Sequence, residues 1–196
     1  MVSDVDKFVY LGCGKCGSSS IGAMLREVPG VRGHQHDSIL YYRDRQSDWN
    51  DHYVFTFCRN PYSRLVSAWF EYKKKGMFQG LKNELSEKHL NRVIDHFPAF
   101  VKSIERVDHI HWNRFDMLLR DVDIDFVGRF ENLQEDFDTV CDKIGIPRQQ
   151  LPHENKSKHK HYTEYYDEAT KQIVAEKYAK DIEYFNYKFD DFSQLD

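Results

Sequence analysis

Short hydrophobic runs and helix-like segments alternate along the first part of the chain. Residues 7–11 and 53–58 are rich in β-branched and aromatic side chains, which predicts two strands. Each run leads into a segment with helical periodicity, residues 18–27 after the first and 61–75 after the second. Strands that alternate with helices predict a parallel sheet covered by helices, with the ligand at the carboxyl ends of the strands.

The second half of the chain continues this alternation. The pattern predicts a helix over residues 88–106, a short strand over 125–127 and a helix over 133–144. The clearest helical spacing comes last, at the apolar positions Tyr166, Ile173, Val174, Tyr178, Ile182 and Phe185. The fold class that follows is α/β, a P-loop-like three-layer fold with a central parallel sheet flanked by helices. At 196 residues, we expect one domain over residues 1–196.

The turn between the first strand and its helix has the composition of an anion site. It reads G-C-G-K-C-G-S-S-S over residues 12–20. A glycine-rich turn lets backbone N–H groups converge, and the N-terminus of the next helix adds unpaired donors and a partial positive charge. A lysine supplies a full charge, and three serines supply hydroxyl donors. We expect a phosphate or sulfate to be bound by Lys15, Cys16, Gly17, Ser18, Ser19 and Ser20.

Other interpretations of this turn stay open. It is not a standard nucleotide-triphosphate loop, because Lys15 comes too early for that pattern. It is also compatible with a plain helix cap on a flexible turn. The C-x-x-C formed by Cys13 and Cys16 has the spacing of a thioredoxin-like redox site. A zinc site is weaker, since Cys58 and Cys141 are isolated and no second pair follows.

A second cluster of polar residues follows the strand at residues 53–58. Arg59 stands at the predicted end of the strand, Asn60 is a good N-cap, and Pro61 suits the first helical turn. Arg64 and Ser67 are three residues apart and therefore neighbours on the helix surface. An arginine fork with a hydroxyl suits a second phosphate, although an arginine and a serine that face solvent would give the same pattern.

Taken together, the two motifs resemble the sulfotransferase superfamily. The R-N-P-x-x-R-x-x-S-x-W pattern at residues 59–69 follows the lysine-glycine-serine turn by some forty residues, which looks most like the branch that contains Golgi-type carbohydrate sulfotransferases. The resemblance implies dependence on 3′-phosphoadenylyl sulfate (PAPS), with the turn holding the 5′-phosphosulfate and with Arg59 and Ser67 holding the 3′-phosphate. Residues 127–137, residues 151–158 and the tyrosine-rich helix that ends in residues 181–187 also look like this branch, so the resemblance spans roughly residues 7–187. Cys13 and Gly14 depart from it, because the family often has proline before the lysine.

The resemblance also implies a reaction, transfer of a sulfuryl group to an acceptor hydroxyl, expected on a carbohydrate. The nucleotide product would be 3′-phosphoadenosine 5′-phosphate (PAP), and no metal is required. Sulfuryl transfer is chemically close to phosphoryl transfer, so Lys15 should neutralise the leaving phosphate oxygen. The acceptor needs a general base. His36 is the first candidate and His34 the second, since some uronyl-acting relatives resemble this chain in having an H-x-H there; His111 also looks like a family feature.

A basic island at residues 156–161 lies in an irregular segment after two prolines. We expect it to fold over the bound donor, with Ser157 and Lys158 as ligands. The other basic runs are expected to be solvated surface.

Composition limits the remaining choices. A net charge of −4 argues against a general nucleic-acid binder. The chain shows neither a signal peptide nor a window of about twenty apolar residues, and its four cysteines form no framework. These features favour a cytoplasmic protein, with the lumenal domain of a Golgi-type enzyme cut from its anchor as the alternative.

Two alternative functions stay open. One is a small-molecule or nucleotide kinase with an atypical phosphate loop, and the other is a non-catalytic module that binds PAPS or PAP.

Overall fold

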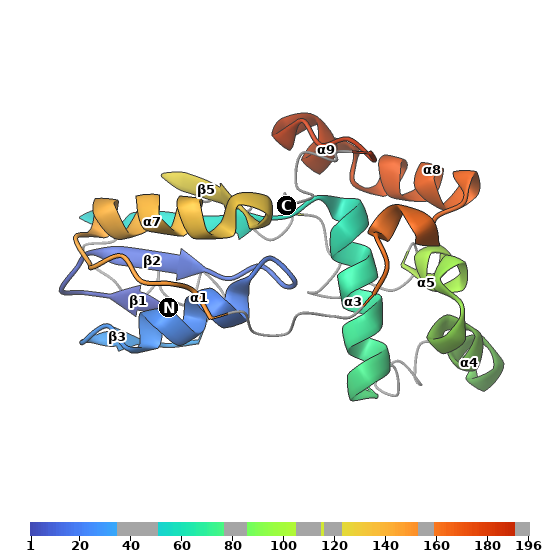
Figure 1. Ribbon diagram of the computed structural model, residues 1–196, viewed down its shortest axis with the longest axis horizontal. Helices are drawn as coiled ribbons and strands as arrows, with labels where there is room; N and C mark the ends of the chain where they lie inside the picture. Colours follow the sequence, from blue (N-terminus) through green and yellow to red (C-terminus); the bar gives the residue numbers. More distant parts are fainter. Residues whose placement is uncertain (35–50, 77–85, 105–114, 116–122, 153–158, 191–196) are drawn as a thin grey trace. The chain divides into compact units, whose positions relative to one another are not determined.

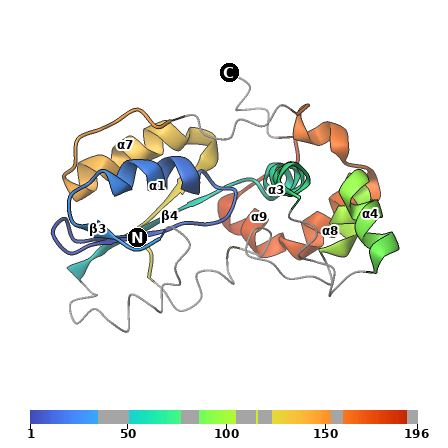
Figure 2. The ribbon, with the colours of Figure 1, turned by 90° about the horizontal axis from the view of Figure 1, so that it is seen from below.

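The computed structural model describes residues 1–34, 51–76, 86–104, 115, 123–152 and 159–190. Contacts divide the chain into two compact units that interleave in sequence. The first unit comprises Met1–Arg59 with Leu118–Lys156, and the second comprises Asn60–Met117 with Ser157–Asp196. Most of the helices and strands are labelled in Figure 1, and β4 is labelled in Figure 2.

The first unit is built on a five-stranded sheet with the strand order β3-β1-β2-β4-β5. The strands are β1 (Val2–Ser3), β2 (Phe8–Leu11), β3 (Val31–Arg32), β4 (Tyr53–Cys58) and β5 (Phe126–Arg129). Strands β2, β4 and β5 are parallel, whereas β1 is antiparallel to both of its neighbours. The prediction of an α/β fold with parallel strands at its centre is confirmed, and the antiparallel edge was not foreseen.

The parallel strands are buried as their composition predicts. Every residue of β2 is buried, and so are the last five of the six residues of β4. Leu11 pairs with Thr56, and Cys58 pairs with Arg129. The carboxyl ends of the three parallel strands therefore meet at one edge of the sheet, where open α/β folds bind their ligands.

Two helices complete the described part of the first unit. Helix α1 (Ser18–Arg26) follows β2, and α7 (Leu133–Ile144) follows β5 through a single 3-10 turn, η3 (Phe130–Asn132). Both helices lie on the same side of the sheet, as Figure 2 shows. They bury apolar side chains such as Ile21 and Val140, both with 0% exposure.

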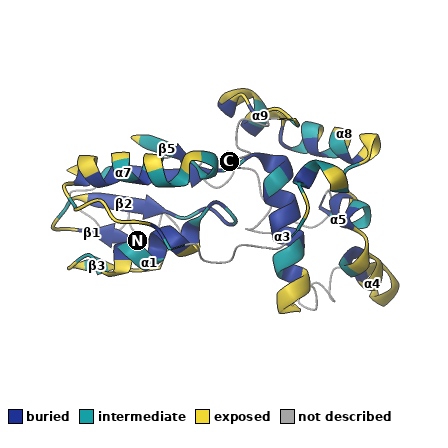
Figure 3. Ribbon diagram, viewed as in Figure 1, coloured by how far each residue is buried: buried dark blue, intermediate teal, exposed yellow. Residues whose placement is uncertain are grey.

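The second unit is helical in its described residues. Its elements are α3 (Pro61–Lys75), α4 (Glu87–Asp95), α5 (Phe97–Ser103), η4 (Tyr162–Tyr165), α8 (Glu168–Lys177) and α9 (Ala179–Phe185). Much of α3 is buried, as the dark blue ribbon in Figure 3 shows. The core around it is aromatic, and Trp69 also donates its indole N–H to the carbonyl of Val93 over 2.9 Å.

Two predicted helices are each divided in the structure. The segment predicted as one helix over residues 88–106 is broken at His96, which is extended with φ −134° and ψ 105°. Pro98 explains the break, since it has no N–H to continue the helical ladder and instead occupies the first turn of α5. The last predicted helix is divided at Tyr178, where ψ rises to 22°. Helices Pro61–Lys75 and Leu133–Ile144 match their predicted bounds.

Two findings concern membranes and metals. None of the helices among the described residues is both long and apolar enough to cross a bilayer. Within the same residues, His, Cys, Asp and Glu side chains do not gather in groups of three or more that could hold a metal ion.

Candidate functional site

The loop between β2 and α1 is a tightly wound turn at the carboxyl edge of the sheet. The backbone N–H of Cys16 donates to the carbonyl of Cys13 over 3.3 Å, which closes a four-residue turn. Lys15 within this turn has φ +67°, in the left-handed region that non-glycine residues seldom occupy. A lysine is thus held in a backbone conformation that costs it roughly 1 kcal/mol, and the surrounding contacts must compensate.

Gly17 ends the loop and caps α1 with φ +81°. A methyl group added at Gly17 would lie 2.8 Å from Leu133 Cδ1, so both the backbone angle and the neighbouring side chain require glycine. Its carbonyl accepts the first helical bond, from Ile21 N–H over 3.1 Å. The N–H groups of the first turn have no acceptor within a helix, and here they belong to the three serines at residues 18–20. Free N–H groups at a helix start are a general means of binding an anion, and anion binding by this helix stays a prediction.

The three serine side chains are placed differently. Ser19 is exposed, whereas Ser18 and Ser20 are each 6% exposed. The hydroxyl of Ser20 donates to the carbonyl of Pro152 over 2.7 Å. A serine hydroxyl has one hydrogen, so while this bond persists Ser20 can offer an anion only its backbone N–H.

Both cysteines of the loop are buried, with Cys13 3% and Cys16 1% exposed, and all four cysteines of the chain are free thiols. The sulfur of Cys13 lies 3.5 Å from the hydroxyl oxygen of Thr56, and that of Cys16 lies 3.5 Å from the carbonyl of Gly14. Burial raises the pKa of the neighbouring Tyr10 hydroxyl well above its usual range, and the two thiols raise it further. Both thiols of the loop are therefore packed in the protein interior.

Arg59 connects the second sequence motif to this loop. Its Nη1 donates to the carbonyl oxygen of Lys15 over 3.2 Å. Its guanidinium carbon lies 3.9 Å from the centre of the Phe130 ring, within the range of a cation–π contact. Arg59 is half-buried in this position. The two predicted phosphate-binding residues Lys15 and Arg59, 44 residues apart in sequence, are thus brought together.

The remainder of the second motif belongs to α3 and the second unit. Asn60 caps the helix as predicted, since its side chain accepts from the N–H of Tyr62 over 3.1 Å, and Pro61 stands in the first turn. Ser67 and Arg64 lie further along α3 and are both buried, at 8% and 2% exposure. The assignment of Ser67 to the 3′-phosphate stays a prediction from the resemblance.

Of the two histidines proposed as general base, only His34 is among the described residues. It is exposed and follows β3, which β1 alone separates from β2. The nitrogen of Met1 donates to the carbonyls of both Tyr10 (2.8 Å) and His34 (3.4 Å). The backbone of His34 therefore reaches the edge of the sheet that carries the loop, two strand spacings or roughly 10 Å along it. His36, Ser157 and Lys158 lie outside the described residues.

Sequence reasoning missed several residues that support the loop. The sequence singled out Phe130, Leu133 and Gln134 only as part of residues 127–137, the stretch similar to the sulfotransferase branch. The side chain of Gln134 accepts from the N–H of Leu151 over 2.8 Å and donates to the carbonyl of Gln149 over 3.0 Å. These two bonds connect residues 149–151 to the start of α7, and Ser20 binds the carbonyl of the following residue, Pro152. These contacts join residues between 15 and more than 100 positions apart, so no local pattern would have revealed them.

Comparison with known proteins gives the family of the chain. The model of the sulfotransferase family matches residues 1–188, and the chain belongs to that family. Family membership gives the general reaction, transfer of a sulfuryl group.

Two individual proteins are similar to the chain. An uncharacterized protein of Archaeoglobus fulgidus is 35% identical over 98 residues, which cover 49% of this chain and 70% of that protein. The crystal structure of a sulfotransferase from Alicyclobacillus acidocaldarius aligns over 95% of this chain and 82% of its own, with a TM-score of 0.36 and 16% sequence identity.

Proposed function

We propose that the chain transfers a sulfuryl group from PAPS to the hydroxyl of an acceptor, in line, and releases PAP. The observation that supports this most directly is the hydrogen bond from Arg59 Nη1 to the carbonyl of Lys15, at 3.2 Å. It joins the two motifs that were predicted independently to bind phosphate groups. A donor with two separate phosphate groups would use both motifs, whereas a single phosphate would leave one unexplained.

The loop supplies the electrostatics that this reaction needs. Negative charge builds on the leaving 5′-phosphate oxygen, and the ammonium of Lys15 together with the N–H groups at the start of α1 would stabilise it. The backbone donors are held by the turn and the helix before the reaction begins, so little reorganisation opposes them. The role of Lys15 in this proposal is charge neutralisation, with no need for a metal ion.

The acceptor and its base are proposed from the resemblance. We place His36 first and His34 second as the base that takes the acceptor proton, and a carbohydrate hydroxyl as the acceptor. Ser67, Ser157 and Lys158 complete the proposed donor ligands. A histidine is suited to this role because its pKa lies near neutral pH.

Calorimetric binding of PAP in the absence of magnesium tests the donor site. We expect the wild-type protein to bind and both Lys15→Ala and Arg59→Ala to weaken binding by about 2 kcal/mol, as for a lost charge-assisted contact. Lys7→Ala is the matched control, because Lys7 is also a lysine with a positive φ (51°) but lies at the opposite end of β2. Equal losses from Lys15→Ala and Lys7→Ala, or no binding by folded wild type, would overturn the donor assignment.

A second measurement tests the transfer itself. With radiolabelled PAPS and a panel of carbohydrate acceptors, we expect a sulfated product whose formation His36→Ala slows at least a hundredfold. Donor binding with no product on any acceptor would instead favour a non-catalytic module, and nucleotide binding that requires magnesium would favour a kinase.

A further inference from the structure

The segment that follows β5 contacts the candidate phosphate loop directly through Leu133 and indirectly through Phe130. Leu133 packs against Gly17, where an added methyl group would lie 2.8 Å from its Cδ1 atom. Phe130 makes the other contact through Arg59, whose guanidinium carbon lies 3.9 Å from the centre of the ring and whose Nη1 reaches the carbonyl of Lys15. The donor site proposed above assigns no role to Phe130.

The backbone that carries Phe130 is itself fixed. The N–H of Arg129 donates to Asp136 Oδ2 over 2.5 Å, which pins the end of β5 to the first turn of α7. One residue earlier, Gly128 lies directly against Phe57, since an added methyl group would be 2.3 Å from Phe57 Cε1. The ring of Phe130 is therefore presented from a constrained strand end.

The ring of Phe130 restricts the conformations that the side chain of Arg59 can adopt. A free arginine side chain loses up to about 2 kcal/mol of conformational free energy when it is ordered. An aromatic face attracts the guanidinium and covers one of its faces, while its N–H donors still point outward in the guanidinium plane. The ring thus favours the orientation in which one N–H meets the carbonyl of Lys15, and that bond in turn supports the left-handed backbone at Lys15.

We propose that Phe130 is a positioning residue of the donor site. Its ring holds the guanidinium of Arg59, so that Arg59 keeps Lys15 in its left-handed conformation and is already ordered when an anion binds. The identity of that anion as the phosphate of PAP rests on the proposed function, whereas the effect of the ring on the loop does not.

Binding of PAP gives the first test. We expect Phe130→Leu, which keeps the apolar bulk without the aromatic face, to weaken binding about five- to tenfold. Phe130→Tyr should bind within about twofold of wild type, and so should the control Phe126→Leu, at the other end of β5. In the Arg59→Ala background, Phe130→Leu should cause no further loss. An equal loss in both backgrounds, or no loss in either, would overturn the proposal.

Reactivity of the loop thiols tests the same proposal without any ligand. Cys13 and Cys16 are buried within the loop, and Cys141 is buried in α7, where desolvation raises its pKa to about 11. We expect Phe130→Leu and Arg59→Ala to speed alkylation of Cys13 and Cys16 by iodoacetamide severalfold, with Cys141 unchanged and Phe130→Tyr like wild type. Loop thiols that react at the wild-type rate in Phe130→Leu would contradict the positioning role. Faster alkylation of the loop thiols in Phe130→Leu, together with a folded wild-type protein that does not bind PAP, would support the positioning role and overturn only the proposed function.

Discussion

The hydroxyl of Ser20 donates to the carbonyl oxygen of Pro152 over 2.7 Å, although 132 residues separate the two in sequence. Ser20 belongs to the first turn of α1, and Pro152 follows the segment that Gln134 fastens to α7. The start of the candidate anion-binding helix is thereby tied to a distant part of the chain. The hydroxyl of Ser20 thus contributes a hydrogen bond to the fold, and its effect on the free energy of unfolding can be measured.

Replacing Ser20 by alanine should lower the free energy of unfolding by about 1 kcal/mol, because the carbonyl of Pro152 loses its partner in a part-buried position. The control is Ser19→Ala, which changes an exposed neighbour on the same turn and should stay within about 0.5 kcal/mol of wild type. Urea unfolding of the three proteins provides the comparison. Two variants of equal stability would show that the bond to Pro152 contributes nothing.

Gly17→Ala should be more damaging than an ordinary glycine replacement. Alanine would be strained at φ +81°, and its methyl group would meet Leu133 at 2.8 Å. We expect a loss of about 2 to 3 kcal/mol in unfolding free energy. Gly76→Ala is the matched control, since Gly76 also has a positive φ (+64°) but nothing within 4 Å of the added methyl, and strain alone should cost it about 1 kcal/mol.

The role of Leu133 in that prediction can be separated by a second substitution. In a Leu133→Ala background the clash is removed, and Gly17→Ala should then cost about as much as Gly76→Ala. If the cost of Gly17→Ala stays the same in both backgrounds, the side chain of Leu133 is not what makes glycine necessary.

The elements that the sequence predicted are those whose signal is local. Strand β4 and helices α3 and α7 have long hydrophobic or periodic patterns, and their bounds agree with the prediction. Strands β1 and β3 have two residues each, too few to show alternation. Strand β1 forms by pairing with β2, and β3 forms by pairing with β1. The helix break at His96 had a local signal in Pro98, which outweighed the apolar periodicity.

The candidate site likewise contains one part with a local sequence signal and one part without it. The turn that leads from the strand into a glycine-capped helix was predictable because its glycines and serines are next to one another in sequence, while its binding of an anion stays a prediction. The contacts of Arg59 with Lys15 and Phe130 join residues 44 and 71 positions apart, and they depend on strands β2, β4 and β5 being neighbours. Such contacts follow from strand order, which hydrophobic patterns alone do not determine.

Asn60 should tolerate neither alanine nor aspartate. Its side chain accepts from the N–H of Tyr62 and also donates to the carbonyl of Lys188 over 2.9 Å, and the residue is 4% exposed. Asn60→Ala removes both bonds and should cost about 2 kcal/mol. Aspartate caps helices as well as asparagine does, but it cannot donate and would set a charge against the Lys188 carbonyl, so Asn60→Asp should cost at least 1 kcal/mol.

The measurement for these variants is urea unfolding at neutral pH. Ser86→Ala is a useful comparison, because Ser86 is the N-cap residue of α4 but its side chain makes no cap bond to the helix backbone and instead lies 2.8 Å from Nδ1 of the His89 ring in an exposed contact. Its change should fall within about 0.5 kcal/mol of wild type. An Asn60→Asp variant as stable as wild type would mean that capping alone accounts for this residue.

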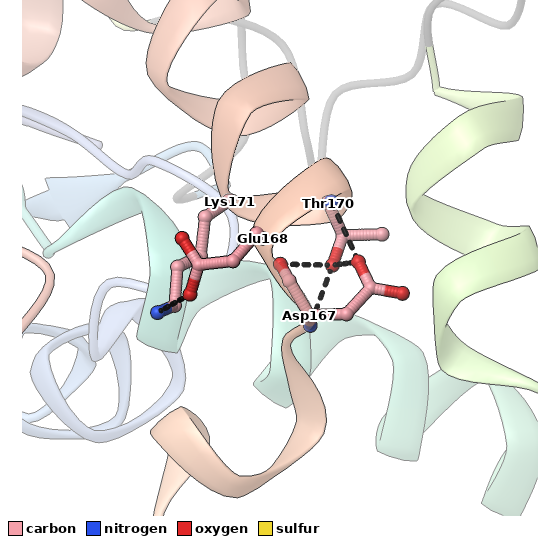
Figure 4. Close-up of polar contacts among 4 residues, drawn as sticks. All are labelled: Asp167, Glu168, Thr170 and Lys171. Carbon is pink, nitrogen blue, oxygen red and sulfur yellow. Dashed lines mark hydrogen bonds and ion pairs between the residues drawn. The ribbon is translucent and has the colours of Figure 1, made fainter.

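The capping box at the start of α8 should make stability depend on pH. Asp167 accepts from both the N–H (2.8 Å) and the hydroxyl (2.6 Å) of Thr170, as Figure 4 shows. The hydroxyl bond is the largest cause that holds the pKa of Asp167 below its ordinary value, with a smaller contribution from Lys102. An aspartate with a lowered pKa stabilises the folded state above its unfolded pKa of about 3.9, and the effect is lost as the pH falls through the folded pKa.

Wild type should therefore melt at a higher temperature than Asp167→Ala at about pH 7, and this difference should narrow as the pH falls below about 4. Asp167→Asn keeps the acceptor oxygen without a titrating group, so its advantage over Asp167→Ala should persist at about pH 3. Glu168→Ala is the neighbouring control, since it removes an exposed ion pair with Lys171 and should change the melting temperature little at neutral pH. Melting curves across this pH range decide the matter: a wild-type advantage over Asp167→Ala that does not shrink in acid would show that the charge of Asp167 does not contribute to the cap.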